Sequence, residues 1–533
     1  MIDDYVQEET RKLFTEGRYG EAQVKALIDL SEGDNCKSRF AGIISEHCDV
    51  TIRGTGGPNS AGESNGIVFR QIPASVEHDS DGHITIMGRG MAVNSGMLED
   101  EVETLEHNGI SCNNLLISED AGVIMPYHRV ADSGDMDMAN GGIGTTGNGI
   151  GPCYADLTAR IGIKVGDLYD EDVLRCRLEK AKAHYERVNV AVAAKRAVNA
   201  IKKLRVNDLL NPKSLRDTLR EAMGPFNRVD IDRIIAEIKP SANRLRPYVT
   251  NTNREAQCLY REGKKILLTH GQGTGLSIDY GTYPWVTSSS ATANGIAAGA
   301  GLCDSQVQER FGVQRWPYNG RVGGGPLPTE IGGKASEEWC EARLNDGSWA
   351  NQVVDELEMF GIPYKIVDGK VKYDHHHPLI KELMNDRNEL LVGISVRLAG
   401  GEYGGGSKRP RRIAWQNMQK IIYGAVVNNL TALLPSKLDV IEGMDRFMVY
   451  RDYDYDVNHS RGCDLYKVKP TDPIEFSGFY HSLNGTKTIN DLPEGLRDSL
   501  EFLQWELFEK TGKWLDIPMA SIGTGKYDLV VRG

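Results

Sequence analysis

The chain has 533 residues, of which 40% are hydrophobic and 26% are charged, values typical of a globular protein that folds in water. This length is sufficient for one large α/β domain with insertions or for two to three smaller domains. The formal net charge of -12 argues against nucleic acid as a partner, because a phosphate backbone binds to positive surfaces. It does not exclude single nucleotides, which bind in local cationic pockets.

The cysteines indicate a reducing compartment. Nine are present at irregular spacings without a C-x-x-C pair, so we expect neither a disulfide framework nor a zinc site. The N-terminal residues 1–14 are charged, and the chain has no run of about 18 apolar residues. These features predict a cytoplasmic protein without a signal peptide or membrane span, or one of the host cytoplasm if the chain is viral.

The first 120 residues predict the beginning of an α/β sheet. Residues 1–23 form an amphipathic N-terminal extension. The elements expected after it are a buried strand at 24–30, a loop at 31–39, a helix at 40–48, a strand at 49–53, a strand at 83–88, a helix near 96–107 and a strand at 114–119. Strands that alternate with loops and helices in this way are typical of an α/β sheet.

The remaining chain adds two predicted insertions to this sheet. Residues 170–205 are rich in helix formers, and the helical character continues, which predicts a helical insertion near 170–262. A second insertion of mixed character is expected near 334–400. The other expected elements are a strand at 265–269, a helix at 415–429, a strand at 430–435 and a helix near 494–511. The predicted fold class is therefore α/β, one large domain over 24–533 with a mostly parallel central sheet, a helical insertion and smaller subdomains.

Glycine is abundant, with 59 residues concentrated in a few loops. Each loop alone is explained equally well by tight turns, but five in one chain indicate phosphate and ribose binding, because glycine lets backbone N–H groups approach oxygen atoms closely. The five loops are RGTGGPNSAGES (53–64), GGIGTTGNGIGP (141–152), HGQGTGLSIDYGTYPWVTSSSAT (270–292), GRVGGGPLPTE (320–330) and GGGSKRPRR (404–412).

Four segments closely resemble signature segments of the adenylosuccinate synthetase family and occur in the order of that family. They are IGTTGNGIGPCY (143–154), GQGTGLSIDYGTYPWVTSS (271–289), RVGGGPLPTE (321–330) and SKLDV (436–440). With flanking matches, the resemblance covers most of 24–168, 264–332 and 404–533. It implies a GTP-dependent ligase in purine biosynthesis, in which GTP phosphorylates the 6-oxygen of IMP and the amine of L-aspartate then displaces that phosphate.

The resemblance implies four catalytic residues and one further metal ligand. Asp34 occupies the position of the catalytic base that removes the N1 proton, and a carboxylate can also ligate Mg²⁺, the implied cofactor. Gly62 is the second implied metal ligand. Lys37 occupies a phosphate-binding position near the start of a helix, and Gln272 matches the glutamine that holds the 6-oxo group. Glu63 occupies the position of a catalytic histidine.

The purine nucleotide and aspartate are also assigned residues by the resemblance. The positions that match its 6-oxopurine nucleotide site are Asn59, Thr146, Arg160, Thr287 and Arg409. In the family the arginine at the position of Arg160 comes from the neighbouring subunit, which implies a homodimer. The positions that match its aspartate site are Ser407, Arg409 and Arg411. Arginine suits a carboxylate because its fork makes two parallel hydrogen bonds.

The guanine nucleotide is assigned residues in three parts of the chain. The matching positions are Gly33, Lys37, Lys437, Asp439, Gly523, Thr524 and Gly525. The carboxylate of Asp439 suits guanine because it can accept from both N1–H and the 2-amino group. Adenine has no N1–H, so a site built on this pairing discriminates against it.

Several positions depart from the family pattern at the phosphate end of the site. The family reads G-D-E-G-K-G-K, whereas Cys36 and Ser38 replace two glycines here. The second loop has one inserted residue and Glu63 in place of histidine, and an ionised carboxylate near phosphate is unfavourable. Asn148 replaces an arginine that helps to bind aspartate.

Two alternatives therefore remain open beside the standard reaction. One is a phage-type synthetase that joins aspartate to dGMP as a precursor of 2-aminoadenine; Asp34 and Asp439 favour the standard reaction over it. The other is a catalytically impaired homologue that binds nucleotides, which the replacement at Glu63 motivates.

Overall fold

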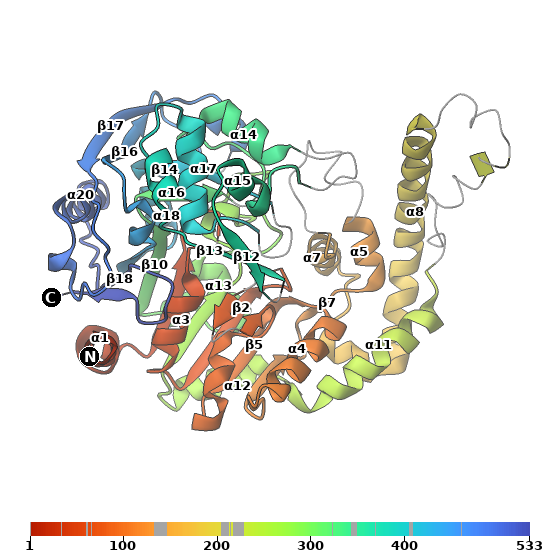
Figure 1. Cartoon of the computed structure of the whole chain (residues 1–533). Helices are drawn as coiled ribbons and strands as arrows, with labels where there is room; N and C mark the ends of the chain where they lie inside the picture. The colour runs from red at the N-terminus through yellow and green to blue at the C-terminus, as the bar shows by residue number, and fades with distance from the viewer. Residues whose placement is uncertain are drawn as a thin grey trace.

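The structure is a computed structural model (Figure 1). It describes residues 2–33, 35–59, 62–64, 67–132, 147–203, 213, 215–216, 229–321, 323–342, 349–367, 369–404, 409–459 and 461–532.

The central sheet has nine strands in the described part of the chain, and every neighbouring pair is parallel. The order is β15-β10-β1-β9-β2-β5-β6-β8, and β7 pairs with β5. The strands are β1 (Val24–Asp29), β2 (Val50–Gly56), β5 (Ile84–Val93), β6 (Leu115–Ser118), β7 (Gly122–Val123), β8 (Val249–Thr250), β9 (Ile266–His270), β10 (Glu309–Arg315) and β15 (Ala432–Ser436). The predicted fold class is confirmed.

Both faces of this sheet are covered by helices. Successive side chains of a strand point to opposite faces, so neighbouring residues of β1 belong to different hydrophobic clusters. Leu27 belongs to a buried cluster with helices α1 (Ile2–Thr15) and α3 (Lys37–Ser45). Its neighbours Ala26 and Ile28 belong to another cluster with α13 (Ala293–Ala300) and α18 (Met418–Val427). Helix α13 approaches the sheet so closely that a Cβ on Gly54 of β2 would lie 2.2 Å from the carbonyl oxygen of Ile296. Glycine is therefore required at that contact.

A helical region surrounds the β5–β8 side of the sheet. Helix α8 (Glu171–Lys203) stands at the far side of the molecule from both chain ends, next to α11 (Ile231–Leu245) (Figure 1). The other helices here are α4 (Ser95–His107), α5 (Pro126–Asp132), α7 (Ile150–Ala159) and α12 (Thr252–Arg261). The range 170–262 is not purely helical, because β8 lies within it and pairs with β6.

The C-terminal half builds a second, four-stranded sheet in the order β11-β14-β16-β17. Its strands are β11 (Tyr318–Arg321), β14 (Arg412–Asn417), β16 (Arg446–Tyr453) and β17 (Pro470–Ser477). The expected helix at 415–429 begins later, at Met418, because Asn417 ends β14 and its side chain caps α18 by accepting from the Gln419 N–H. The expected C-terminal helix is α20 (Glu494–Thr511).

The range of the second predicted insertion forms a mixed subdomain beside this sheet. Its elements are α14 (Gly333–Glu341), α15 (Val353–Met359), β12 (Tyr364–Val367), β13 (Lys370–Tyr373), α16 (Pro378–Leu383) and α17 (Glu389–Gly400). The smaller strands of the chain are β3 (Gly62–Ser64), β4 (Ile67–Phe69), β18 (Met519–Ser521) and β19 (Leu529–Val531). None of the helices among the described residues is long and apolar enough to cross a membrane.

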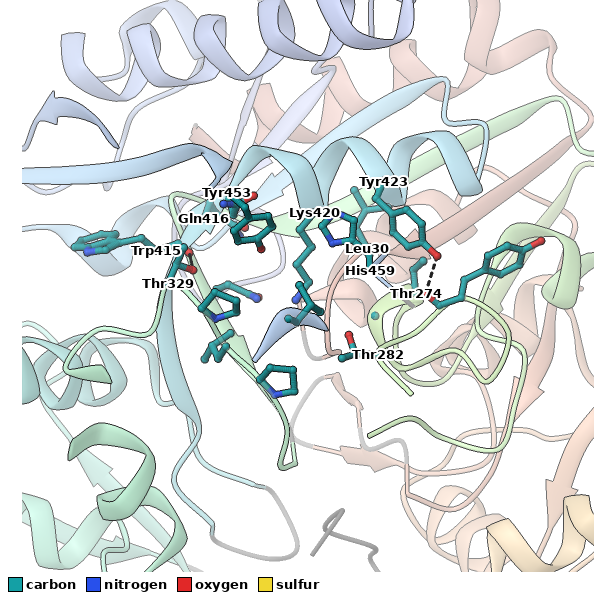
Figure 2. A pocket seen from close by; sticks show the side chains of 18 residues that line it. Leu30, Thr274, Thr282, Thr329, Trp415, Gln416, Lys420, Tyr423, Tyr453 and His459 are labelled. Atoms are coloured by element: carbon teal, nitrogen blue, oxygen red, sulfur yellow. Dashed lines mark hydrogen bonds between the residues drawn. The ribbon is translucent and has the colours of Figure 1, made fainter. Parts of the chain in front are cut away.

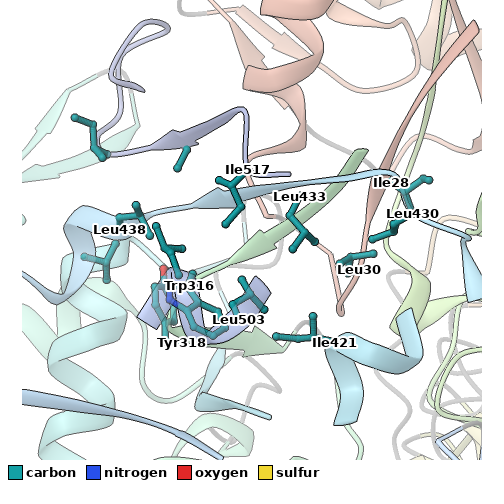
Figure 3. Packing of buried hydrophobic residues seen from close by; sticks show 14 of the residues in the cluster. Ile28, Leu30, Trp316, Tyr318, Ile421, Leu430, Leu433, Leu438, Leu503 and Ile517 are labelled. Carbon is teal, nitrogen blue, oxygen red and sulfur yellow. The ribbon is translucent and has the colours of Figure 1, made fainter. Parts of the chain in front are cut away.

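One hydrophobic cluster joins the two sheets (Figure 3). Leu30, at the end of β1, and Leu433 of β15 belong to it together with Leu503 of α20. Trp316, directly after β10, is completely buried in it, and its indole N–H donates to Ser499 Oγ over 2.9 Å. The cluster therefore fixes the second sheet against the carboxyl end of the first.

The N-terminal extension contributes to the core. Phe14 of α1 is completely buried and contacts the rings of Tyr19 and Phe311. Replacing Phe14→Ala should lower the free energy of unfolding by about 3–5 kcal/mol, because it leaves a cavity against the sheet. Urea denaturation measures this change. Tyr480→Ala, at a side chain that is 62% exposed, should change the free energy of unfolding by less than about 0.5 kcal/mol. Equal effects of the two substitutions would contradict a packing role for α1.

Candidate active site

The glycine-rich loops meet at the carboxyl edge of the central sheet. The loop at 30–36 follows β1, the loop from Gly57 follows β2, the loop from Gly271 follows β9, and Lys437 follows β15. Because these strands are parallel, their carboxyl ends lie at one edge, where open α/β sheets bind ligands. The fold therefore brings together segments that are up to about 400 residues apart in the sequence.

A buried carboxylate anchors the first loop. The side chain of Asp29 accepts from the backbone N–H groups of Ser31 (3.1 Å) and Asn35 (3.3 Å) and from Asn35 Nδ2 (2.8 Å). Burial raises the pKa of Asp29 to about 6, although Lys37 and Arg315 act in the opposite direction. Asp34 lies outside the described residues. Sequence reasoning missed Asp29, and an acidic residue that ends an otherwise apolar strand is the signal for it.

The two sides of this loop have different backbone requirements. Gly33 has φ +89°, which glycine adopts without strain, and Cys36 has φ +63°, in the left-handed region that favours glycine. Cys36 immediately precedes α3, so the cysteine occupies a position whose backbone would suit a glycine better.

Lys37 and Gln272 lie together, as the resemblance implies. Lys37 Nζ donates to the carbonyl oxygen of Gln272 over 2.8 Å. Gln272 also has a positive φ of +59°, and its Oε1 accepts from Ser289 Oγ over 3.4 Å. Thr287 is half-buried in the same loop, where its N–H donates to the carbonyl of Leu276. The start of α3, directly after the loop at 30–36, and the glycine-rich loop at 270–292 therefore form one wall of the site.

The glycine-rich loops at 53–64 and 141–152 also meet. Asn148 Nδ2 donates to Asn59 Oδ1, and the N–H of Gly149 donates to Asp132 over 2.7 Å. Thr146 lies outside the described residues. Gly62 and Glu63 lie in β3, where Glu63 pairs with Val68 of β4. Arg160, by contrast, is exposed at the end of α7 with φ +64°.

The predicted guanine segment forms a short 3-10 turn after β15. Lys437 has φ +59° and precedes the turn that contains Asp439. Asp439 Oδ1 is buried and has no hydrogen-bond partner among the described residues. Burial raises the pKa of Asp439. An unsatisfied buried acceptor is costly in a folded protein, so this oxygen suits a ligand that donates hydrogen bonds.

The predicted C-terminal contact lies beside this turn. Gly523, Thr524 and Gly525 form the loop between β18 and β19. Arg39 of α3 donates to the carbonyl of Gly523 and, over 2.5 Å, to Ser521 Oγ. Arg39 therefore connects the loop between β18 and β19 to α3, the helix that follows the loop at 30–36.

The predicted aspartate segment is divided between two environments. Arg409 stacks on the ring of Trp349 at 4.4 Å and lies 3.4 Å from Glu341, in the range of the second insertion. Arg411 instead turns inward and donates to Glu402 Oε2 over 2.7 Å. Ser407 lies outside the described residues.

Glu402, which sequence reasoning missed, has four partner residues at the site. Its carboxylate is completely buried and accepts from Arg315, Arg411, Lys437 and the hydroxyl of Tyr318. Burial alone would raise the pKa of this group, but the three cations hold it well below its usual value. Glu402 therefore remains ionised. Through Arg411 and Lys437 it connects the segment expected to bind aspartate with the segment expected to bind GTP.

A second buried charge cluster lies behind the first loop. Glu32 accepts from Arg321 over 3.0 Å, from Asn319 over 3.0 Å and from Lys420. Although burial acts in the opposite direction, Lys420 and Arg321 lower the pKa of Glu32 to about 2. Nothing in the local sequence marks Glu32 as part of such a cluster. Its contacts with Arg321, Asn319 and Lys420 hold the loop at 30–36 in place.

A small cavity of about 30 Å³ adjoins this cluster (Figure 2). Lys420, His459 and Tyr423 lie side by side on its wall, and the His459 and Tyr423 rings stack with centroids 5.0 Å apart. Such a volume suits about two water molecules and is too small for a nucleotide. Residues of the glycine-rich loops 270–292 and 320–330 line part of this cavity, but none of the predicted binding residues does, so we place the substrate site where those residues lie.

The implied Mg²⁺ would not be held by protein side chains alone. The described residues contain no group of three or more His, Cys, Asp or Glu side chains that would hold a metal ion. Mg²⁺ is commonly held by one or two carboxylates together with substrate phosphates and water, so a protein-only cluster is not required. The described residues are compatible with that arrangement.

A parallel sheet with glycine-rich loops at its carboxyl edge is typical of nucleotide-binding α/β proteins. The sequence profile described as "Adenylosuccinate synthetase" matches residues 26–203 and 188–528. The chain therefore belongs to the adenylosuccinate synthetase family, whose members are C–N ligases.

Relatives match over nearly the whole chain. The adenylosuccinate synthetase of Halothermothrix orenii is 30% identical over 518 residues, which are 94% of this chain and 96% of that protein. That of Micrococcus luteus is 29% identical over 490 residues, 90% of this chain and 92% of that protein. The solved structure of fully ligated adenylosuccinate synthetase from Plasmodium falciparum has a TM-score of 0.69 and 22% identity, and covers 96% of this chain and 100% of its own. The fold is therefore shared along the whole length.

The buried carboxyl of Asp29 makes the stability of the first loop depend on pH. Its pKa is about 6 in the folded chain and 3.8 as a free group, so the folded state binds the proton more tightly. This contribution is complete below the unfolded pKa and is lost as the pH rises through 6. Between pH 4.5 and 7.5, the native protein should therefore lose about 2 kcal/mol of unfolding free energy relative to Asp29→Asn.

Urea denaturation of both proteins across this pH range measures the difference. Asp279→Asn, at an exposed position, serves as the control and should follow the native protein at every pH. A constant difference between Asp29→Asn and the native protein would show that Asp29 does not titrate in this range.

Proposed function

We propose that this chain joins L-aspartate to carbon 6 of an IMP-like 6-oxopurine nucleotide at the expense of GTP. The observation that carries the proposal is that Glu402 holds both Arg411 and Lys437. The segments expected to bind aspartate and guanine nucleotide therefore lie in one hydrogen-bonded cluster. Family membership supports the same reaction.

The proposed reaction proceeds in two steps at the glycine loops. In the first, Asp34 takes the N1 proton, the 6-oxygen attacks the γ-phosphorus of GTP, and GDP leaves. In the second, the aspartate amine attacks carbon 6, and the 6-phosphoryl group leaves as phosphate. Lys37 lies 2.8 Å from the Gln272 carbonyl, so one wall offers a cation for phosphate and an amide for the 6-oxo group. Mg²⁺, held by Asp34 and the carbonyl of Gly62, would neutralise charge on the phosphates.

The guanine specificity is assigned to Asp439. Its buried Oδ1, unpartnered among the described residues, suits the N1–H and 2-amino donors of guanine. Lys437 would lie along the base, and the loop from Gly523 to Gly525 would close the site from the side of Arg39. Adenine would leave the carboxylate buried and unpaired, which accounts for a preference for GTP.

Further assignments complete the proposal. Asn59, Thr146, Thr287 and Arg409 would bind the purine nucleotide, and Ser407, Arg409 and Arg411 would bind the aspartate carboxylates. Arg160 is exposed, which is compatible with a contribution to the site of a second subunit in a homodimer. We expect the protein to act in the cytoplasm.

Turnover tests the proposal directly. The purified protein with IMP, L-aspartate, GTP and Mg²⁺ should release GDP and phosphate in equal amounts and form the succinyl nucleotide, measured by chromatography. Asp34→Asn should lower kcat by at least about 10²-fold, because it removes the proton acceptor. Asp100→Asn, at an exposed position of α4, should retain native activity.

The same assay separates the alternatives. Faster turnover of dGMP than of IMP would favour the phage-type reaction. Calorimetric binding of GDP without phosphate release from any of these substrates would favour an impaired homologue.

Specificity for the base tests the assignment of Asp439. An asparagine offers one acceptor and one donor, which match xanthine, whose C2 carries a carbonyl where guanine carries an amine. Asp439→Asn should therefore lower kcat/KM for GTP by about 10²-fold or more and raise that for XTP. Asp445→Asn, exposed nearby, should keep the native preference for GTP. An unchanged GTP:XTP ratio in Asp439→Asn would place the guanine elsewhere.

A further inference from the structure

Glu402 lies at the base of the loop expected to bind aspartate. The loop has two arms, and the N–H of Arg411 donates to the carbonyl of Glu402 over 2.9 Å. The N–H of Gly404 likewise donates to the carbonyl of Arg409 over 2.9 Å, and Tyr403 pairs with Pro410 in an antiparallel bridge. The backbone thus holds the two arms side by side, with the Glu402 side chain directed into the protein core.

The two oxygens of this carboxylate have different partners. Oε1 accepts from Arg315 Nε over 2.9 Å, from the Tyr318 hydroxyl over 2.8 Å and from Lys437 Nζ over 2.6 Å. Oε2 accepts from Arg315 Nη2 over 2.9 Å and from Arg411 Nη1 over 2.7 Å. Arg315 makes a bidentate pair, the strongest geometry of an arginine with a carboxylate. Lys437 and Arg411 therefore each take one side of a carboxylate that Arg315 already orients.

The partners also differ in their access to ligands. The side chains of Glu402 and Arg315 are completely buried. Those of Arg411 and Lys437 are 11% and 17% exposed, so each of these side chains reaches the edge of the cluster. Arg315 and Tyr318 are thus internal partners, whereas Arg411 and Lys437 connect Glu402 to the segments expected to bind aspartate and GTP.

The cluster reaches a third segment through Arg315. Its Nη1 donates to the carbonyl of Gly33 over 3.2 Å and to Asn35 Oδ1 over 2.8 Å, on either side of the position proposed for the catalytic base. One carboxylate is therefore connected directly to two expected binding segments and through one arginine to the loop that follows β1.

We propose that Glu402 is the positioning residue that fixes Arg411 and Lys437 relative to each other, so that the aspartate and guanine-nucleotide sites are formed together. This inference rests on the proposed function. Glu402 does not touch the reacting atoms in this assignment; it acts through the two cations. A displacement of about 1 Å in such a residue can lower activity by about 10²-fold.

Two substitutions test this role in different ways. Glu402→Asp retains the charge that the buried Arg315 requires, but withdraws the carboxylate by one methylene, so that it no longer reaches both cations. Glu402→Gln retains the shape and removes the charge. Both should raise KM for L-aspartate and KM for GTP together, by about ten- to hundredfold, with KM for the 6-oxopurine nucleotide within about twofold of the native value.

The matched control is Glu506→Gln. Glu506 of α20 is also a completely buried glutamate with an arginine partner, Arg451, and among the described residues no ion pair joins it to a predicted binding segment. This substitution should lower the melting temperature and leave all three KM values unchanged. It therefore separates loss of stability from loss of positioning.

The outcomes are distinguishable. Folded Glu402→Asp, verified by circular dichroism, with native KM values for aspartate and GTP would overturn the proposal, as would an equal rise in all three KM values. If Glu402→Gln does not fold, Glu402→Asp alone decides.

A protein that does not turn over would refute the proposed function, but calorimetry with GDP still tests Glu402. Weaker GDP binding in Glu402→Asp than in Glu506→Gln would support the positioning role, and equal GDP affinities would refute it.

Discussion

The ion pair between Arg315 and Glu402 is the interaction on which the binding loops depend. Both side chains are completely buried, and the transfer of two charges from water costs several kcal/mol each unless nearly every donor and acceptor is satisfied. The fold meets this requirement with groups from four parts of the chain, including Gly33, Tyr318 and Lys437. The need to satisfy one buried pair therefore draws together segments that would otherwise be independent surface loops.

The parallel sheet supplies the geometry in which this is possible. β1, β10 and β15 are neighbours, so the residues that follow them lie side by side at one edge. The hydrophobic cluster around Trp316 packs the second sheet against that edge. Glu402 lies in the connection between α17 and β14, so this packing places it beside the edge. The site is thus formed between two sheets, with the sheet core rather than the loops determining the positions of its charges.

Much of the fold and part of the site could be predicted from local patterns. Apolar runs such as 24–30 predicted the strands, and glycine with hydroxyl and amide residues marked the loops that contain Gln272 and Asn59, whereas Lys37 was assigned from the family resemblance. Glu32 and Glu402 escaped prediction because each is one acidic residue without a local motif, and the only local signal for Asp29 is its place at the end of an apolar strand. Their importance depends on burial and on cations far away in the chain, for example Lys420, which lies 388 residues from Glu32.

The sequence by itself determined the family, the parallel α/β class and the positions of the glycine-rich loops, because these depend on residue type and short spacing. Only the tertiary structure decided that Arg411 faces Glu402 while Arg409 stacks on Trp349, although the two arginines are two residues apart. It also decided that Asp439 Oδ1 is buried without a partner in the described chain. The physical reason is that the energy of a charge depends on its surroundings, and those surroundings come from distant parts of the chain.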